Sequence, residues 1–323
     1  MQELKITMLG ASGVGKTTLL TAMYEQFESN IGNTNLQLTP DDESAAILQD
    51  RLIELKSLLD VFEARGEVGI TPTNASDVRS FCFGLGEKGA KPSLQLRFYD
   101  YSGEYHESKA SKEEKEAVKK LLRESTAVLI PIDSPSLMEK NGKFHEKKNR
   151  PQQIKGLFNA AYQDLDSPRL VIFAPVKCEK YLRNSATAKE LLEAVKQGYA
   201  PLIDHFNSPN LNPWIASVIT PVQTVGSVVF SRMEVDNNNP RFYFRKTRHD
   251  AQYSPVDSEQ PLRYLLRFLL KLHFENRRWL FFNFVRDWLE LDSYLKKAVD
   301  EFARGCKTNG QFTVIKGEKW LNI

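Results

Sequence analysis

The sequence predicts a three-layer α/β domain with a mostly parallel sheet, one antiparallel edge strand and a helical C-terminal region that covers it. Three observations support this fold class. An apolar strand at 4–9 runs through a glycine-rich loop into a helical stretch at 18–24. Apolar strands and helical stretches then alternate along the chain. Residues 170–174 are almost wholly apolar, which is typical of the centre of a parallel sheet.

We expect an α/β domain at 1–230, which contains a helical insertion at about 41–65. A mainly helical extension at 231–323 should pack on it, because the apolar residues of this region fall on broad helical faces.

The glycine loop, residues 10–17, reads Gly-Ala-Ser-Gly-Val-Gly-Lys-Thr and fits the pattern Gly-x-x-x-x-Gly-Lys-[Ser/Thr]. Its glycines let successive N–H groups point at phosphate oxygens, and the following helix adds its positive N-terminal end. Lys16 should reach the β- and γ-phosphates, and the Thr17 hydroxyl should bind Mg²⁺. The alternative is an ordinary turn before a helix. The candidate nucleotide-binding residues here are Ser12, Gly13, Val14, Gly15, Lys16, Thr17 and Thr18.

Composition limits the other function classes. The 323 residues are 41% hydrophobic and 26% charged, with a net charge of +3, which gives no case for general nucleic-acid binding. Three scattered cysteines suggest neither disulfides nor zinc, and we expect a reduced, cytoplasmic setting without a signal peptide. The five histidines show no ligand spacing. Charges interrupt the most apolar stretch, 265–285, so we expect no membrane span.

The region after the first helix should begin with a polar loop at 28–40. A helix from about 41 to near 66 follows, and its leucines form one apolar stripe that packs on the domain or binds a partner. Alternating apolar residues then predict a hairpin of strands at 81–85 and 94–98.

The second strand of this hairpin ends in Asp100-Tyr-Ser-Gly-Glu. An acidic residue at a strand end, downstream of a phosphate-binding loop, is the expected carboxylate on the Mg²⁺ side. Here the chain resembles the Ras-like branch of P-loop GTPases. The resemblance implies that Asp100 holds the Mg²⁺ shell, that Gly103 meets the γ-phosphate and that Thr73, or else Thr71, closes on the metal. Ordinary turn chemistry is the alternative for these residues.

The catalytic residues that we expect are Lys16 and Glu104, and Glu104 stands where Ras-like proteins have a water-orienting glutamine. The alternative is that a partner supplies an arginine or a water-positioning group, while Glu104 makes only a surface contact. His106 is a weak further candidate for the base.

Helices should alternate with strands through the rest of the chain. Residues 143–150 should form a basic loop, and 241–249 an edge strand or surface loop rather than a nucleic-acid contact. The expected helices are 108–124, 152–165, 189–206, 259–275, 277–289 and 292–304, and the expected strands are 127–132, 170–174, 214–219 and 311–315.

The strand at 170–174 leads to Pro-Val-Lys-Cys-Glu at 175–179, where Ras-like GTPases carry the guanine-reading Asn-Lys-x-Asp. Lys177 matches, Val176 replaces the asparagine, and Glu179 replaces the aspartate. A carboxylate at this place can accept both N–H donors of guanine. In the last loop, Pro221 has no N–H, so the backbone donor to the base should be Val222 or Gln223. The alternative is a surface Lys-Cys-Glu that follows a strand.

Together these pieces resemble the bacterial double-GTPase proteins of biological conflict systems. The resemblance rests on Lys-Cys-Glu-Lys at 177–180, Thr-Pro-Val-Gln-Thr-Val-Gly at 220–226 and the segment 253–262. It implies a nucleotide switch that works with unidentified protein partners, and no substrate beyond the nucleotide. From the motifs we expect the chain to bind GTP and GDP with Mg²⁺ and, because Glu104 replaces the glutamine, to hydrolyse GTP slowly without a partner. An ATP-driven machine, a small-molecule kinase and a binding module without hydrolysis remain alternatives.

Overall fold

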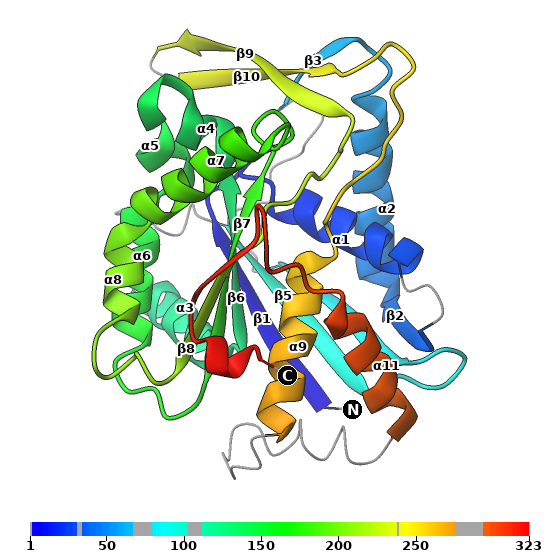
Figure 1. Cartoon of the computed structure of the whole chain (residues 1–323), viewed down its shortest axis with the longest axis vertical. Helices are drawn as coiled ribbons and strands as arrows, with labels where there is room; N and C mark the ends of the chain where they lie inside the picture. Colours follow the sequence, from blue (N-terminus) through cyan, green and yellow to red (C-terminus); the bar gives the residue numbers. More distant parts are fainter. Residues whose placement is uncertain are drawn as a thin grey trace.

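A computed structural model gives the structure of the chain, and an eight-stranded sheet lies at its centre (Figure 1). The strand order is β11-β8-β7-β6-β1-β5-β4-β2. The residues that the structure describes are 2–30, 34–66, 79–102, 112–237, 239–274 and 293–322.

The five middle strands of the sheet run parallel to one another. All eight residues of β7 are buried, which explains the apolar run in the sequence. The five strands are β1 (Gln2–Gly10), β5 (Leu94–Ser102), β6 (Ala127–Asp133), β7 (Arg169–Val176) and β8 (Ile215–Ile219).

Both edges of the sheet are antiparallel, whereas the sequence predicted one such edge. At one edge, β11 (Thr313–Lys316) pairs with β8. At the other, β4 (Arg79–Glu87) forms the predicted hairpin with β5, and β2 (Leu36–Pro40) pairs with β4. The expectation of a loop over 28–40 was therefore wrong. Leu36 and Leu38 are buried and alternate with more exposed residues, but their polar flanks obscure this short pattern.

Helices cover both faces of the sheet (Figure 1). One face packs against α1 (Lys16–Asn30), α9 (Gln260–Phe274) and α11 (Ser293–Arg304). The other face packs against α3 (Lys112–Glu124), α6 (Pro151–Ala161), α7 (Ser185–Gly198) and α8 (Ala200–Phe206). The molecule is thus a three-layer α/β fold, as the sequence predicted.

The insertion after β2 is a helix followed by a strand. The helix α2 (Asp42–Ser57) begins at Asp41, whose side chain accepts a hydrogen bond from the Ser44 N–H at 2.9 Å. It ends at Ser57 and not near Gly66, because the chain turns there and continues into β3 (Glu63–Arg65).

A second, three-stranded sheet has the order β3-β10-β9 and lies at the top of Figure 1. Its other strands are β9 (Val228–Asp236) and β10 (Asn239–Lys246), both antiparallel. The basic, aromatic stretch at 241–249 thus contributes a strand, which is the middle strand of this sheet. The expected boundary at 230 falls inside β9, and the region beyond it contributes strands as well as helices.

Two further expectations about helices differ from the structure. The basic stretch at 143–150, expected as a loop, contains the short helix α5 (His145–Asn149), which follows α4 (Ser134–Met138) and a 3₁₀ turn (Glu139–Gly142). The helix expected at 189–206 is two helices, α7 and α8, because Pro201 cannot continue a helix from the preceding turn. The helix expected at 277–289 lies outside the described residues.

No helix in the described part of the chain combines the length and the apolar character that crossing a bilayer requires.

Candidate functional site

The glycine loop connects β1 to α1 at the carboxyl end of the parallel strands, the edge where ligands bind in open α/β sheets. Gly13 and Gly15 have backbone φ angles of +77° and +113°, which residues with a Cβ rarely adopt. The first N–H groups of α1 have no acceptor inside the helix and face the loop. The loop therefore has the backbone of an anion-binding site.

Lys16 lies inside this loop and is only 7% exposed. Its Nζ donates to the carbonyl oxygens of Gly10 at 2.9 Å and Ala11 at 3.2 Å. The same atom is 3.5 Å from Oδ1 of Asp100. The buried ammonium is thus held at the glycine loop, beside the Asp100 carboxylate.

Asp100 and Thr17 meet beside this lysine. The Thr17 hydroxyl donates to Asp100 Oδ2 at 3.2 Å, and Asp100 is 3% exposed. Among the described residues, Asp100 Oδ1 is buried and makes no hydrogen bond. A buried carboxylate oxygen that makes no hydrogen bond, next to a hydroxyl, fits a hard cation such as Mg²⁺. Thr17 and Asp100 are the residues that would hold it.

Three predicted site residues, Thr73, Gly103 and Glu104, lie outside the described residues, as do the weaker candidates Thr71 and His106.

Lys177 connects the glycine loop to the ends of two strands. It follows β7, and its φ of +54° marks a sharp change of direction. Its Nζ donates to the Gly13 carbonyl oxygen at 3.2 Å and to Asp133 Oδ2 at 2.6 Å. Asp133 is the last residue of β6, and the sequence analysis did not identify it as a site residue.

The Asp133 carboxylate is almost fully buried, and burial alone would raise its pKa. The Lys177 ammonium and hydrogen bonds from Ser136 outweigh this effect and hold the pKa of Asp133 below its ordinary value. Asp133 is therefore a charged anchor for Lys177.

Glu179 points at the 220–226 loop, and its Oε1 accepts hydrogen bonds from the N–H groups of Val225 and Gly226, each at 3.3 Å. Burial raises the pKa of Glu179 above its ordinary value, while these hydrogen bonds oppose that shift. The structure thus brings Glu179 and the 220–226 loop together.

The two backbone donors expected in this loop are already in use. The Val222 N–H donates to the Pro175 carbonyl oxygen at 2.8 Å, and the Gln223 N–H donates to that of Val256 at 3.1 Å. These bonds tie the loop to β7 and to the segment 253–258, so neither N–H points at a ligand.

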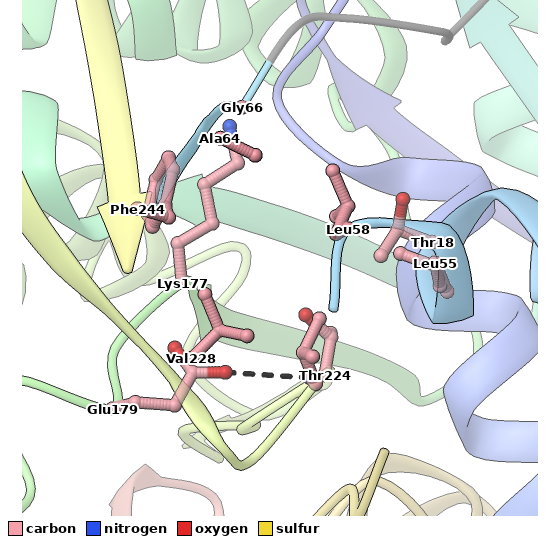
Figure 2. A pocket seen from close by; sticks show the side chains of 11 residues that line it. Thr18, Leu55, Leu58, Ala64, Gly66, Lys177, Glu179, Thr224, Val228 and Phe244 are labelled. Carbon is pink, nitrogen blue, oxygen red and sulfur yellow. Dashed lines mark hydrogen bonds between the residues drawn. The ribbon is translucent and has the colours of Figure 1, made fainter. Parts of the chain in front are cut away.

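A pocket lies between Lys177, Glu179 and Thr18, and Figure 2 shows them with Leu55 of α2, Leu58 just after that helix and Phe244 of β10. It encloses about 540 Å³ of space, including solvent at its mouth. Sequence reasoning missed Thr224 and Phe244 as lining residues. Phe244 lay in the stretch that was interpreted as an edge strand or surface loop. The remaining lining residues are Ala64, Gly66, Thr224, Val225 and Val228.

No protein-family model matches this sequence, and no curated protein matches it either. Solved structures similar to it include the GTPase-like domain of Ski7 from S. cerevisiae, bound to GDP and inorganic phosphate, with 15% identity and a TM-score of 0.35. The same domain bound to GTP gives 16% identity and a TM-score of 0.37. The matches cover 69% and 70% of this chain, but only 43% and 44% of the Ski7 chains. Nothing about the ligand of this chain follows from so distant a likeness.

Proposed function

We propose that this chain is a molecular switch that binds GTP with Mg²⁺ and hydrolyses it, changing its affinity for partner proteins. The observation that carries the proposal is the meeting of Lys16, Thr17 and Asp100 at the glycine loop, with Lys177 and Glu179 at the adjoining pocket.

The phosphates would lie against the N–H groups of the glycine loop and the first turn of α1. Lys16 would move from the Gly10 and Ala11 carbonyls to the β- and γ-phosphates. Thr17 and Asp100 would hold Mg²⁺, which neutralises charge on the triphosphate when bound.

The base would enter the pocket beside Lys177 and Glu179. Guanine offers two neighbouring N–H donors, and a carboxylate accepts such a pair better than a neutral group does. Adenine lacks that pair of donors, so Glu179 favours GTP.

The switching step is loss of the γ-phosphate, which would change the contacts made by Thr73 and Gly103. The resemblance to double-GTPase proteins extends the proposal to a cytoplasmic role in a bacterial conflict system. Glu104 stands in place of a water-orienting glutamine, so we expect slow intrinsic hydrolysis.

A second candidate is an ATP-driven or non-hydrolysing nucleotide-binding protein. It is favoured by the loss of guanine-reading groups. Val176 replaces the expected asparagine, and the Val222 and Gln223 N–H groups bond to backbone carbonyls.

A competition series with GTP, ATP and XTP, followed by turnover measurement, tests both candidates. Lys16→Ala should abolish binding, because it removes the ammonium that would reach the β- and γ-phosphates. Lys196→Ala is the matched control, since this lysine pairs with Glu193 on the exposed surface of α7. Unchanged GTP affinity in Lys16→Ala, or equal affinity of the wild type for ATP and GTP, would reject the GTP-switch proposal.

A further inference from the structure

Arg51 is a buried arginine close to the phosphate end of the site. It lies on α2 and is 9% exposed. The buried face of α2 also carries Ser44, Leu48 and Leu55. Ser44 Oγ accepts a hydrogen bond from the Cys82 N–H of β4 at 2.9 Å. At the other end, Leu55 lines the pocket near Thr18 (Figure 2). Arg51 therefore lies between β4 and the pocket, one turn before Leu55.

The path of α2 leads Arg51 to the level of Asp100. From the Ser44–Cys82 bond, the helix advances about 10 Å to Arg51. Followed backward from Cys82, β4 covers about the same distance to Arg79, which pairs with Asp100 across the hairpin. Both elements thus arrive at the strand end where Thr17 and Asp100 meet.

The charges around Arg51 agree with this placement. Burial lowers the pKa of Arg51 and the Arg79 charge lowers it further, while the carboxylates of Glu54 and Asp100 raise it. A guanidinium stays protonated in such surroundings, because its ordinary pKa is very high. The Arg51 charge therefore lies near enough to Asp100 for the two to attract each other.

Arg51 pairs with a carboxylate on its own helix, but one of its donors makes no aligned hydrogen bond to any described residue. Arg51 Nη1 is 2.6 Å from Glu54 Oε2, but within the described part of the chain neither atom makes an aligned hydrogen bond. A buried donor without a well-aligned acceptor is costly. Phosphate oxygens match the fork of donors that a guanidinium presents.

We propose that Arg51 supplies, from within the chain, the positive charge that stabilises the phosphoryl group during hydrolysis. The inference rests on the proposed GTPase function. The water oxygen bonds to the γ-phosphorus as the bond from that phosphorus to the β,γ-bridging oxygen breaks. GDP, inorganic phosphate and a proton released to solvent are the products. Arg51 would leave Glu54 and donate to the oxygens on which negative charge grows.

This assignment differs from the expectation that a partner brings the arginine. It leaves the water-positioning group unassigned, so the partner-free rate can remain slow even with Arg51 in place.

The test uses the full chain with GDP, Mg²⁺ and aluminium fluoride, a mimic of the phosphoryl group in transfer, together with single-turnover hydrolysis of GTP. Arg51→Ala and Arg51→Lys should bind GTP within about threefold of the wild type. Both should lose the fluoride complex, and the hydrolysis rate should fall about a hundredfold, in keeping with the large effects of arginines that contact a transferred phosphoryl group. Arg51→Lys keeps the charge and the buried stem, so it decides the question if Arg51→Ala does not fold.

Glu54→Gln is the matched control, because it breaks the same ion pair and keeps the guanidinium. It should retain both the fluoride complex and the hydrolysis rate. The inference is overturned if Arg51→Lys matches the wild type in both assays, or if Glu54→Gln loses as much as Arg51→Lys. Absence of GTP binding in the wild type would instead reject the proposed function, and the inference with it.

Discussion

Gly226 shows how a single backbone position fixes the 220–226 loop. Its φ is +76°, and a Cβ added to it would lie 1.7 Å from the Ser254 carbonyl oxygen. Its N–H also donates to Glu179. A residue with a side chain would have to push the loop away from the 253–258 segment and disturb the carboxylate that we propose reads the base.

Replacing Gly226 with alanine should therefore destabilise the chain by at least about 2 kcal/mol, because backbone strain adds to a steric clash. Two glycines serve as controls in the same denaturant titration. Gly89 also has a positive φ, +81°, but a Cβ added there would have no atom within 4 Å. Gly89→Ala should therefore lower the free energy of unfolding by about 1 kcal/mol. Gly156→Ala, in open space on α6, should stabilise by about 0.5–1 kcal/mol. Equal losses at Gly226 and Gly89 would show that the Ser254 contact does not matter.

Glu179 should determine the choice of base. Glu179→Ala leaves two guanine donors without an acceptor, a penalty of about 1–3 kcal/mol, so GTP affinity should fall roughly tenfold while ATP affinity changes little. Binding titrations with both nucleotides measure this. Glu139→Ala is the control, because that carboxylate pairs with Lys180 and accepts from the Tyr181 hydroxyl, and it does not line the pocket. A parallel loss of GTP and ATP affinity in Glu179→Ala would mean that Glu179 supports the loop rather than reads the base.

At the scale of elements, the ends of β6 and β7 and the start of α4 are joined through one carboxylate. Asp133 accepts hydrogen bonds from the N–H and hydroxyl of Ser136 at the start of α4, and it pairs with Lys177 after β7. Asn149 of α5 donates to the Asp133 carbonyl oxygen and accepts from its N–H. The junction that holds Lys177 over the glycine loop therefore depends on the charge of Asp133.

This junction should give stability a defined pH dependence. Since the pKa of Asp133 is lowered in the folded chain from its ordinary value of 3.8, its contribution is fully present above about pH 4 and is lost as the pH falls through the folded pKa. Asp133→Asn should lower the free energy of unfolding by about 1–3 kcal/mol at pH 7. The difference in stability between this variant and the wild type should become smaller below about pH 4. Urea titrations between pH 3 and pH 7 test this. A gap that stays constant over that range would show that the Asp133 charge does not contribute.

The sequence predicts the central elements well and the peripheral ones less well, for a physical reason. Strands buried on both faces, such as β7, need continuous apolar runs, and the runs are visible. The edge strand β2 is short and half-exposed, so its alternation spans few residues. The ends of α2 and the break between α7 and α8 depend on turns and on a proline, which a periodic pattern does not register.

The candidate site likewise contains residues that the sequence could identify and residues that it could not. Lys16, Thr17 and Asp100 belong to short patterns whose spacing reflects their chemistry, so the sequence could place them together. Phe244 lines the pocket from a strand that carries no such pattern, and Arg51, which we propose acts at the site, lies on a helix that carries none either. Their role depends on how α2 and the three-stranded sheet fold over the pocket, and that arrangement can be seen only in three dimensions.

At the scale of the whole molecule, the segment 253–258 joins distant parts of the chain. Its backbone bonds to Gln223 and Val225 in the 220–226 loop. Gln26 of α1 donates to the Pro255 carbonyl oxygen at 2.7 Å, and Lys307 pairs with Asp257. The loop beside the pocket is thus connected through one segment to α1 and to the chain that follows α11.

Nucleotide binding should therefore slow hydrogen exchange in 253–258, which does not line the pocket. We expect this protection with GTP and Mg²⁺, and none with Lys16→Ala under the same conditions. The turn at 88–92, at the far end of the β4–β5 hairpin, is the internal control and should not change. Protection confined to the glycine loop would show that the 253–258 segment is not coupled to the site.

The position of α9 and α11 also determines when the fold can be completed. Leu4, Ile6 and Met8 of β1 share one core cluster with α9 and α11, which follow far downstream in the chain. During synthesis, the sheet face that these helices cover stays open until residues 260–304 have been made, on the order of tens of seconds after β1 at typical rates of translation. The nascent chain therefore carries an uncovered apolar surface after its nucleotide-binding motifs have left the ribosome. That interval is when chaperones are most needed and when premature termination would be most damaging.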